Sequence, residues 1–157
     1  MPIVWAGDEV VTTKSGKQIY GMDWFFSGLA QHPVKGLTFF ALSLVGLEQR
    51  QFYPLRIEQV IRSVSEIKAA APNAAPQTKR RRGRPKGSKN KDKTQVNLLS
   101  ELRQICEMLS TLLSTMGESI PLEYLLLDGK FGHNNAVQMT RHLSLYLMGK
   151  LRYDRVL

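Results

Sequence analysis

The chain has 157 residues, 43% of them hydrophobic, which supports one ordinary core and argues against two full domains. A single cysteine, Cys106, excludes an internal disulfide and a cysteine-based zinc site, and no apolar run reaches the roughly 20 residues that cross a bilayer. Of the formal net charge of +9, the segment from Lys79 to Lys93 supplies +8, from nine basic residues and one acidic residue. Subtracting these from the totals of 22 basic and 13 acidic residues leaves 13 and 12, so the rest of the chain is nearly neutral and affinity for polyanions is concentrated in one segment.

The first third of the chain predicts three strands. Residues 3–13 are rich in β-branched types and carry Asp8 and Glu9. Residues 36–45 are apolar on both faces and suit a central strand, whereas Pro54 makes the strand at 51–57 a candidate for a sheet edge. Residues 57–68 have a spacing that permits a helix. The aromatic side chains expected in the core are Trp5, Trp24, Phe25, Phe26, Phe39 and Phe40.

The composition changes in the middle of the chain. Residues 69–93 contain no large apolar side chain and many cations, which predicts a disordered insertion. Apolar residues then recur every three or four positions from Leu98 to Met116, which predicts an amphipathic helix. A strand at 123–128, a helix beginning near Asn134 and a strand at 145–151 complete the chain.

This order of elements predicts an α/β fold of the ribonuclease H-like kind, with a mixed sheet flanked by helices and interrupted by the basic insertion. Three leading strands with short connections should be antiparallel, whereas the strand at 123–128 follows a helix and can lie parallel to the first. Residues 1–68 and 94–157 would form the two parts of one domain, separated by residues 69–93. The first and fourth predicted strands would then be neighbours and would bring Asp8 and Asp128 together across 119 intervening residues.

Asp128 follows three consecutive leucines and precedes a glycine. Open α/β sheets place their chemistry beyond the carboxyl ends of their strands, so a metal or a general base is expected here. Two such carboxylates, aided by a third, can hold two Mg²⁺ ions about 3.5 to 4 Å apart for phosphoryl transfer. An aspartate at a strand end also commonly forms a turn or caps a helix.

The basic segment contains the core Arg82-Gly-Arg-Pro85 flanked by cations, which resembles the AT-hook. In that motif the arginines enter the narrow minor groove of A·T-rich DNA, while the glycine and proline keep the chain deep and extended. The alternatives are a solvated basic linker and a targeting signal. The residues expected to bind DNA are Arg80, Arg81, Arg82, Gly83, Arg84, Pro85, Lys86 and Lys89.

Six segments together resemble the DDE transposases of bacterial insertion sequences, particularly a type frequent in cyanobacteria. They are residues 7–17, 25–27, 36–45, 54–60, 83–90 and 125–135. The resemblance implies a ribonuclease H-like catalytic domain that binds two Mg²⁺ ions, with Asp8 as the first metal-binding aspartate and Asp128 as the second. Glu9 is an alternative to Asp8, because related transposases carry two adjacent aspartates there.

Two departures from the family pattern affect the expected activity. Family members continue into a region whose glutamate, in a Y-x2-R-x3-E-x6-K pattern, completes the metal site, whereas this sequence ends at Leu157. Tyr53-Pro-Leu-Arg56 begins like that pattern, but position 60 is Val60 and the stretch precedes Asp128. The sequence also begins seven residues before Asp8. These features predict the middle part of a transposase.

The resulting hypothesis is a truncated, weakly active or inactive transposase of the insertion-sequence type. The alternatives are a non-catalytic DNA-binding protein that acts through its AT-hook-like segment and a small self-sufficient nuclease of the same fold. The expected partners are double-stranded DNA and either a second copy or full-length transposase, with no membrane. The expected location is the bacterial cytoplasm, in association with the nucleoid. Further candidates for phosphate contacts are Lys14, Lys17 and Lys130.

Overall fold

The computed structural model describes residues 3–16, 18–70, 98–116, 120 and 122–150. The strands are β1 (Ile3–Thr13), β2 (Asp23–Ser27), β3 (His32–Gly46), β4 (Gln51–Gln59), β5 (Tyr124–Leu127) and β6 (Tyr146–Gly149). The helices are α1 (Val64–Ala70), α2 (Ser100–Met116) and α3 (Asn134–His142), with a 3₁₀ turn, η2, at Gly129–Phe131. None of the described helices is long and apolar enough to cross a membrane.

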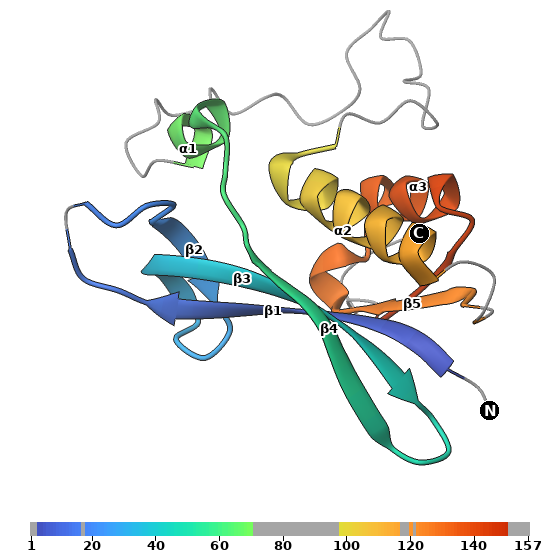
Figure 1. Ribbon diagram of the computed structural model, residues 1–157. Coiled ribbons are helices and arrows are strands. Elements are labelled where there is room, and N and C mark those ends of the chain that lie inside the picture. The colour runs from blue at the N-terminus through green and yellow to red at the C-terminus, as the bar shows by residue number, and fades with distance from the viewer. Residues whose placement is uncertain (1–2, 17, 71–97, 117–119, 121, 151–157) are drawn as a thin grey trace, which may run out of the picture.

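The strands form one mixed sheet in the order β2-β3-β1-β5-β6 (Figure 1). The long strand β3 pairs antiparallel with β1, β2 and β4, and β4 has no second partner strand among the described residues. Strand β5 lies parallel to both β1 and β6. The predicted ribonuclease H-like α/β architecture is therefore confirmed, including the parallel pairing of the first strand with the strand that follows the amphipathic helix.

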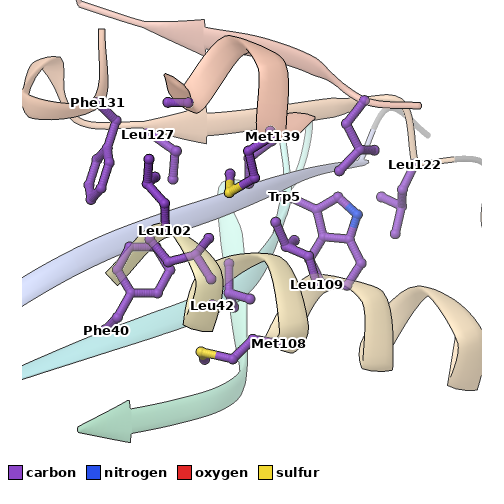
Figure 2. Close-up of a cluster of buried hydrophobic side chains, with 14 of the residues drawn as sticks. Trp5, Phe40, Leu42, Leu102, Met108, Leu109, Leu122, Leu127, Phe131 and Met139 are labelled. Carbon is purple, nitrogen blue, oxygen red and sulfur yellow. The ribbon is translucent and has the colours of Figure 1, made fainter. Parts of the chain in front are cut away.

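Helices α2 and α3 lie on the same side of the sheet (Figure 1). Figure 2 shows side chains of α2, such as Leu102 and Leu109, packed with Trp5 of β1 and Phe40 of β3. Every second residue of β3 from Gly36 to Gly46 is buried on this side, as expected for a strand with one face against helices. Full burial of one large apolar side chain stabilises the folded state by about 1.5–3 kcal/mol.

The other face of the sheet remains partly exposed. Leu126 of β5 pairs with Met148 of β6, and both side chains are exposed. Next to them the rings of Tyr124 and Tyr146 lie with centroids 5.7 Å apart. The described part of the chain thus has a core on one side of the sheet and an apolar, accessible surface on the other.

Strand β2 was not among the predicted strands, and its aromatic residues differ from the expected core. Phe25 is buried, but Trp24 and Phe26 are 46% and 62% exposed. The prediction that all three belong to the core was wrong, because β2 pairs with β3 alone among the described strands and its side chains alternate between the two faces.

The helix predicted at 57–68 was also misplaced. Strand β4 continues through Gln59, which pairs with Phe39, and helix α1 begins only at Val64. The predicted edge position of the strand containing Pro54 is correct, and the pairing with β3 is irregular between Leu42 and Ser43, where Pro54 lies opposite. Of the predicted insertion, residues 71–93 lie outside the described residues.

Glu66 connects the end of the first half of the chain to the start of α2. Its Oε2 accepts hydrogen bonds from the Ser63 N–H at 2.8 Å and the Ser100 hydroxyl at 2.6 Å, and its Oε1 accepts from the Ser100 N–H at 2.9 Å. Burial alone would raise the pKa of Glu66, but these hydrogen bonds lower it to about 2. One ionised carboxylate therefore joins the described residues that precede and follow positions 71–97.

Candidate active site

The pairing of β1 with β5 determines where the two predicted aspartates lie. Gly7 is paired with Leu127. Asp8 is the next residue of β1, and Asp128 is the residue that directly follows β5. Adjacent strands are about 4.8 Å apart, so the two aspartates follow neighbouring backbone positions. Both line a cavity of about 490 Å³, together with Gly7, Leu127 and Gly149. The structure thus brings Asp8 and Asp128 to one site at the end of β5.

Gly7 is the residue that allows close packing beneath this site. A Cβ at Gly7 would lie 2.5 Å from Cζ of Phe40 and 2.6 Å from Cδ2 of Leu127. Cβ atoms essentially never show contacts under 3.0 Å, so Phe40 or Leu127 would have to shift for any larger residue, whereas glycine leaves room for both. The close approach occurs one residue before Asp8 and could not be recognised from the sequence of β1 alone.

Asp128 begins the turn η2 and is held by its own backbone. Its Oδ1 accepts a hydrogen bond from the Gly129 N–H at 2.6 Å. Phe131, the last residue of the turn, is buried and meets Phe40 edge to face, with centroids 5.9 Å apart. The turn is therefore anchored in the core directly below the aspartates.

Glu9, the alternative to Asp8, lies in a different environment. It alternates with Asp8 along β1, and its Oε2 accepts a hydrogen bond from Nζ of Lys130. Lys130 also donates to Oε1 of Glu101 on α2 at 2.7 Å. Burial raises the pKa of Glu9, and the charge of Glu101 adds to this effect, whereas Lys130 opposes it. Glu9 is thus part of an ion cluster that joins β1, α2 and the turn η2.

The other residues that were predicted to contact phosphate or DNA lie in different parts of the chain. Lys130 is engaged by Glu9 and Glu101, and the exposed residue Lys14 follows β1, where its N–H donates to the Lys35 carbonyl oxygen at 3.2 Å. Lys17 lies outside the described residues, as do the eight residues from Arg80 to Lys89 that are predicted to bind DNA. His133 caps α3, where its Nδ1 accepts a hydrogen bond from the Ala136 N–H at 3.3 Å.

Sequence reasoning missed Arg62, Asp23 and Glu101 as residues near the site. Arg62 follows β4 and reaches β2, where its Nη1 donates to Oδ2 of Asp23 at 3.2 Å. A second cavity of about 510 Å³ is lined by Arg62, Lys130 and both aspartates. Glu101 stands in the first turn of α2 and resembles any surface acid of an amphipathic helix. Only the folded arrangement shows that these residues lie near Asp8 and Asp128.

The aspartate pair fits a hard divalent cation. Mg²⁺ is often held by only one or two carboxylates, and water and substrate phosphates complete its shell. Oδ1 of Asp8 and of Asp128 each accept an adjacent backbone N–H, and no hydrogen bond in the described part of the chain engages either Oδ2. Within that part no cluster of three or more histidine, cysteine, aspartate or glutamate residues has the arrangement of a complete metal site.

A family model described as DDE superfamily endonuclease matches residues 1–157. Comparisons with curated proteins and with solved structures gave no significant match. The endonucleases of this superfamily act on DNA and generally use divalent metal ions. Because the match extends over the whole sequence, this chain belongs to the DDE superfamily endonuclease family.

Proposed function

We propose that this chain is a transposase domain of the insertion-sequence kind, which hydrolyses a DNA strand and joins the freed 3′-hydroxyl to a target phosphate, with the 3′-oxygen of the target strand as the leaving group. The observation that carries the proposal is the pairing of Gly7 with Leu127, which places Asp8 and Asp128 side by side at one cavity. Membership of the endonuclease family supports chemistry on DNA in general. The insertion-sequence assignment rests on the resemblance of the six sequence segments.

Asp8 and Asp128 would hold Mg²⁺, which supplies an activated oxygen nucleophile and stabilises the leaving oxygen when it is bound. The protein contributes rigidity. Asp8 stands on a strand paired on both sides, and Asp128 stands on a turn anchored by Phe131 in the core. Lys130 holds the same turn to Glu9. This arrangement would keep both carboxylates in place when a phosphate arrives.

We assign the first metal position to Asp8, with Glu9 as the alternative. Asp8 follows the residue paired with Leu127, whereas the carboxylate of Glu9 is already engaged by Lys130. A metal at Glu9 would have to replace that ion pair. Glu9 therefore serves as the matched comparison for Asp8 in any test of metal binding.

The basic segment would hold the duplex near this site. We assign minor-groove contacts to Arg82 and Arg84, and phosphate contacts to the cations around them. The support is the specific Arg-Gly-Arg-Pro core in a run of net charge +8. Glu66 and Ser100, which precede and follow the segment in the sequence, are joined by hydrogen bonds.

A non-catalytic DNA-binding protein is the second candidate function. One observation favours it, since no third acid completes a metal site within the described residues. Such a protein would bind A·T-rich duplex through the basic segment and would leave the DNA intact. Cleavage is therefore the property that separates the two candidates.

Nicking of supercoiled plasmid in Mg²⁺ or Mn²⁺ tests the proposal without knowledge of the transposon ends. We expect slow nicking by the wild type, background levels for Asp8→Asn and Asp128→Asn, and retained nicking for Glu9→Gln. Equal loss in Glu9→Gln and Asp8→Asn would transfer the first metal position to Glu9. DNA binding without any metal-dependent nicking by the wild type would favour the non-catalytic protein.

A further inference from the structure

The cleft of about 510 Å³ beside the two aspartates is lined by two cations from the described part of the chain, Arg62 and Lys130. Lys130 contacts two carboxylates, those of Glu9 and Glu101, so its charge is already balanced. Arg62 contacts one carboxylate of the described residues, that of Asp23. Arg62 is therefore the better placed of the two to attract a further anion.

Arg62 is also held in a fixed position. Its Nη1 donates to Oδ2 of Asp23 and, at 2.9 Å, to the carbonyl oxygen of Trp24. Its guanidinium carbon lies 4.4 Å from the centroid of the Phe25 ring, a cation–π contact. A guanidinium has five N–H donors, and these contacts use the donors of Nη1 alone. The guanidinium of Arg62 is therefore held at the wall of the cleft, and its other N–H donors take no part in these contacts.

The cleft contains more carboxylates than cations, so a cation is needed there to attract a phosphate. Among the described residues, the carboxylates of Asp8, Glu9 and Asp128 outnumber the cations Arg62 and Lys130 by one. Without Arg62 the cleft would repel an anionic strand more strongly.

We propose that Arg62 binds a backbone phosphate of the DNA strand next to the phosphate that reacts at Asp8 and Asp128. The guanidinium fork matches phosphate oxygens in a bidentate geometry, which a lysine ammonium cannot reproduce. The inference rests on the proposed function, because the cleft is a DNA site only if the two aspartates act on DNA. Arg62 rather than Lys130 is then the phosphate-binding cation of this cleft.

A pair of variants separates phosphate binding from structural support. Arg62→Gln alone would leave Asp23 buried and unpaired, which is destabilising in itself. We therefore compare the full chain carrying Asp23→Asn with the double variant Asp23→Asn/Arg62→Gln. Neither variant contains an unpaired carboxylate at Asp23, and the two differ only at Arg62. Thermal unfolding of both proteins verifies that they are folded.

The probe is a short fluorescent DNA duplex with a nicked strand, bound in Ca²⁺ so that it is not cleaved. A neutral methylphosphonate replaces one phosphate at a time near the nick. We expect the double variant to bind the unmodified duplex about tenfold more weakly than Asp23→Asn. One methylphosphonate position should weaken Asp23→Asn by a similar factor and leave the double variant unchanged, because the lost contact is the same.

Equal affinity of the two variants at every position would overturn the inference and leave Arg62 a structural partner of Asp23. The inference is also overturned if every methylphosphonate weakens DNA binding by both variants equally. Metal-dependent nicking by Asp8→Asn and Asp128→Asn is scored separately. Loss of nicking in these two variants with equal DNA affinity of the Arg62 pair would refute the Arg62 site alone, whereas undiminished nicking would refute the proposed function.

Discussion

At the scale of single residues, the site depends on the lack of a side chain at Gly7 as well as on the two aspartates. Gly7 stands between Phe40 and Leu127 and allows both to pack under Asp8. The two aspartates are exposed, while their immediate support is buried. Changes at the supporting residues should therefore affect metal binding without touching a ligand.

Gly7→Ala should destabilise the protein by about 1–3 kcal/mol, since the added methyl group overlaps Phe40 and Leu127 and forces the core to shift. Urea denaturation measures the change in unfolding free energy. Gly28→Ala is the control, because a Cβ at Gly28 would meet nothing within 4 Å. An unchanged urea midpoint for Gly7→Ala would contradict the predicted steric overlap with Phe40 and Leu127.

Lys130→Met should also destabilise, by about 2 kcal/mol, because it leaves Glu9 and Glu101 unpaired and repelling each other. Adding Glu9→Gln should recover part of this loss, since one of the two charges is then removed. A double-mutant cycle on thermal or urea unfolding measures the coupling. Strictly additive effects would contradict a direct interaction between the two residues.

At the scale of elements, α1 and α2 are joined by the hydrogen bonds of Glu66 to Ser100, and Ser63 donates to the same carboxylate at the start of α1. A group whose pKa is lower in the folded protein stabilises the fold above its unfolded pKa. That contribution is lost as the pH falls toward the folded pKa. For Glu66 the window runs from its ordinary value of 4.5 down to about 2.

Glu66→Gln should therefore be less stable than the wild type at neutral pH, by about 2 kcal/mol for hydrogen bonds to a charged acceptor. The difference should be complete above pH 4.5 and should shrink as the pH falls toward 2. Urea midpoints of both proteins at pH 7 and in the acid range test this. Glu107→Gln, an exposed change on α2, should show no such trend, and a difference independent of pH would refute the charge-based explanation.

The elements also show how far the sequence could predict this structure. The helix α2 and the strands β1 and β5 were recognisable because their apolar residues follow helical or strand spacing. Strand β2 was not, because Trp24 and Phe26 look like core residues when only their chemistry is known. Asp8 and Asp128 were predicted to meet because the order of strands fixes their neighbours. Arg62 and Glu101 were missed because the order of strands does not fix the side-chain contacts that they make with Asp23 and Lys130.

At the scale of the whole molecule, residues 79–93 are strongly basic, and the rest of the sequence is nearly neutral. DNA affinity should follow that division. If roughly six of the nine cations between Lys79 and Lys93 meet phosphates, the slope of log affinity against log salt should be about −5 on duplex DNA. Titrations of the full chain at several salt concentrations measure this slope, and deletion of residues 79–93 should remove most of it.

Arg82→Ala together with Arg84→Ala should reduce the preference for A·T-rich over G·C-rich duplex, because these two side chains are proposed to enter the minor groove. Competition binding with the two duplexes at one salt concentration provides the measurement. Lys91→Ala with Lys93→Ala removes the same charge outside the Arg-Gly-Arg-Pro core and is the matched control. A preference unchanged by the arginine pair would identify the segment as a plain basic linker.

The parallel pairing of β1 with β5 has a consequence for the protein while it is being made. Asp8 is synthesised well before its partner strand, which ends at Leu127. At about 5–20 residues per second, the 119 residues between the two aspartates take about 6 to 24 s to synthesise. During that time the nascent chain holds only half of the aspartate pair. A protein with the proposed activity on DNA would thus be inert during this interval and become competent only after β5 has docked beside β1.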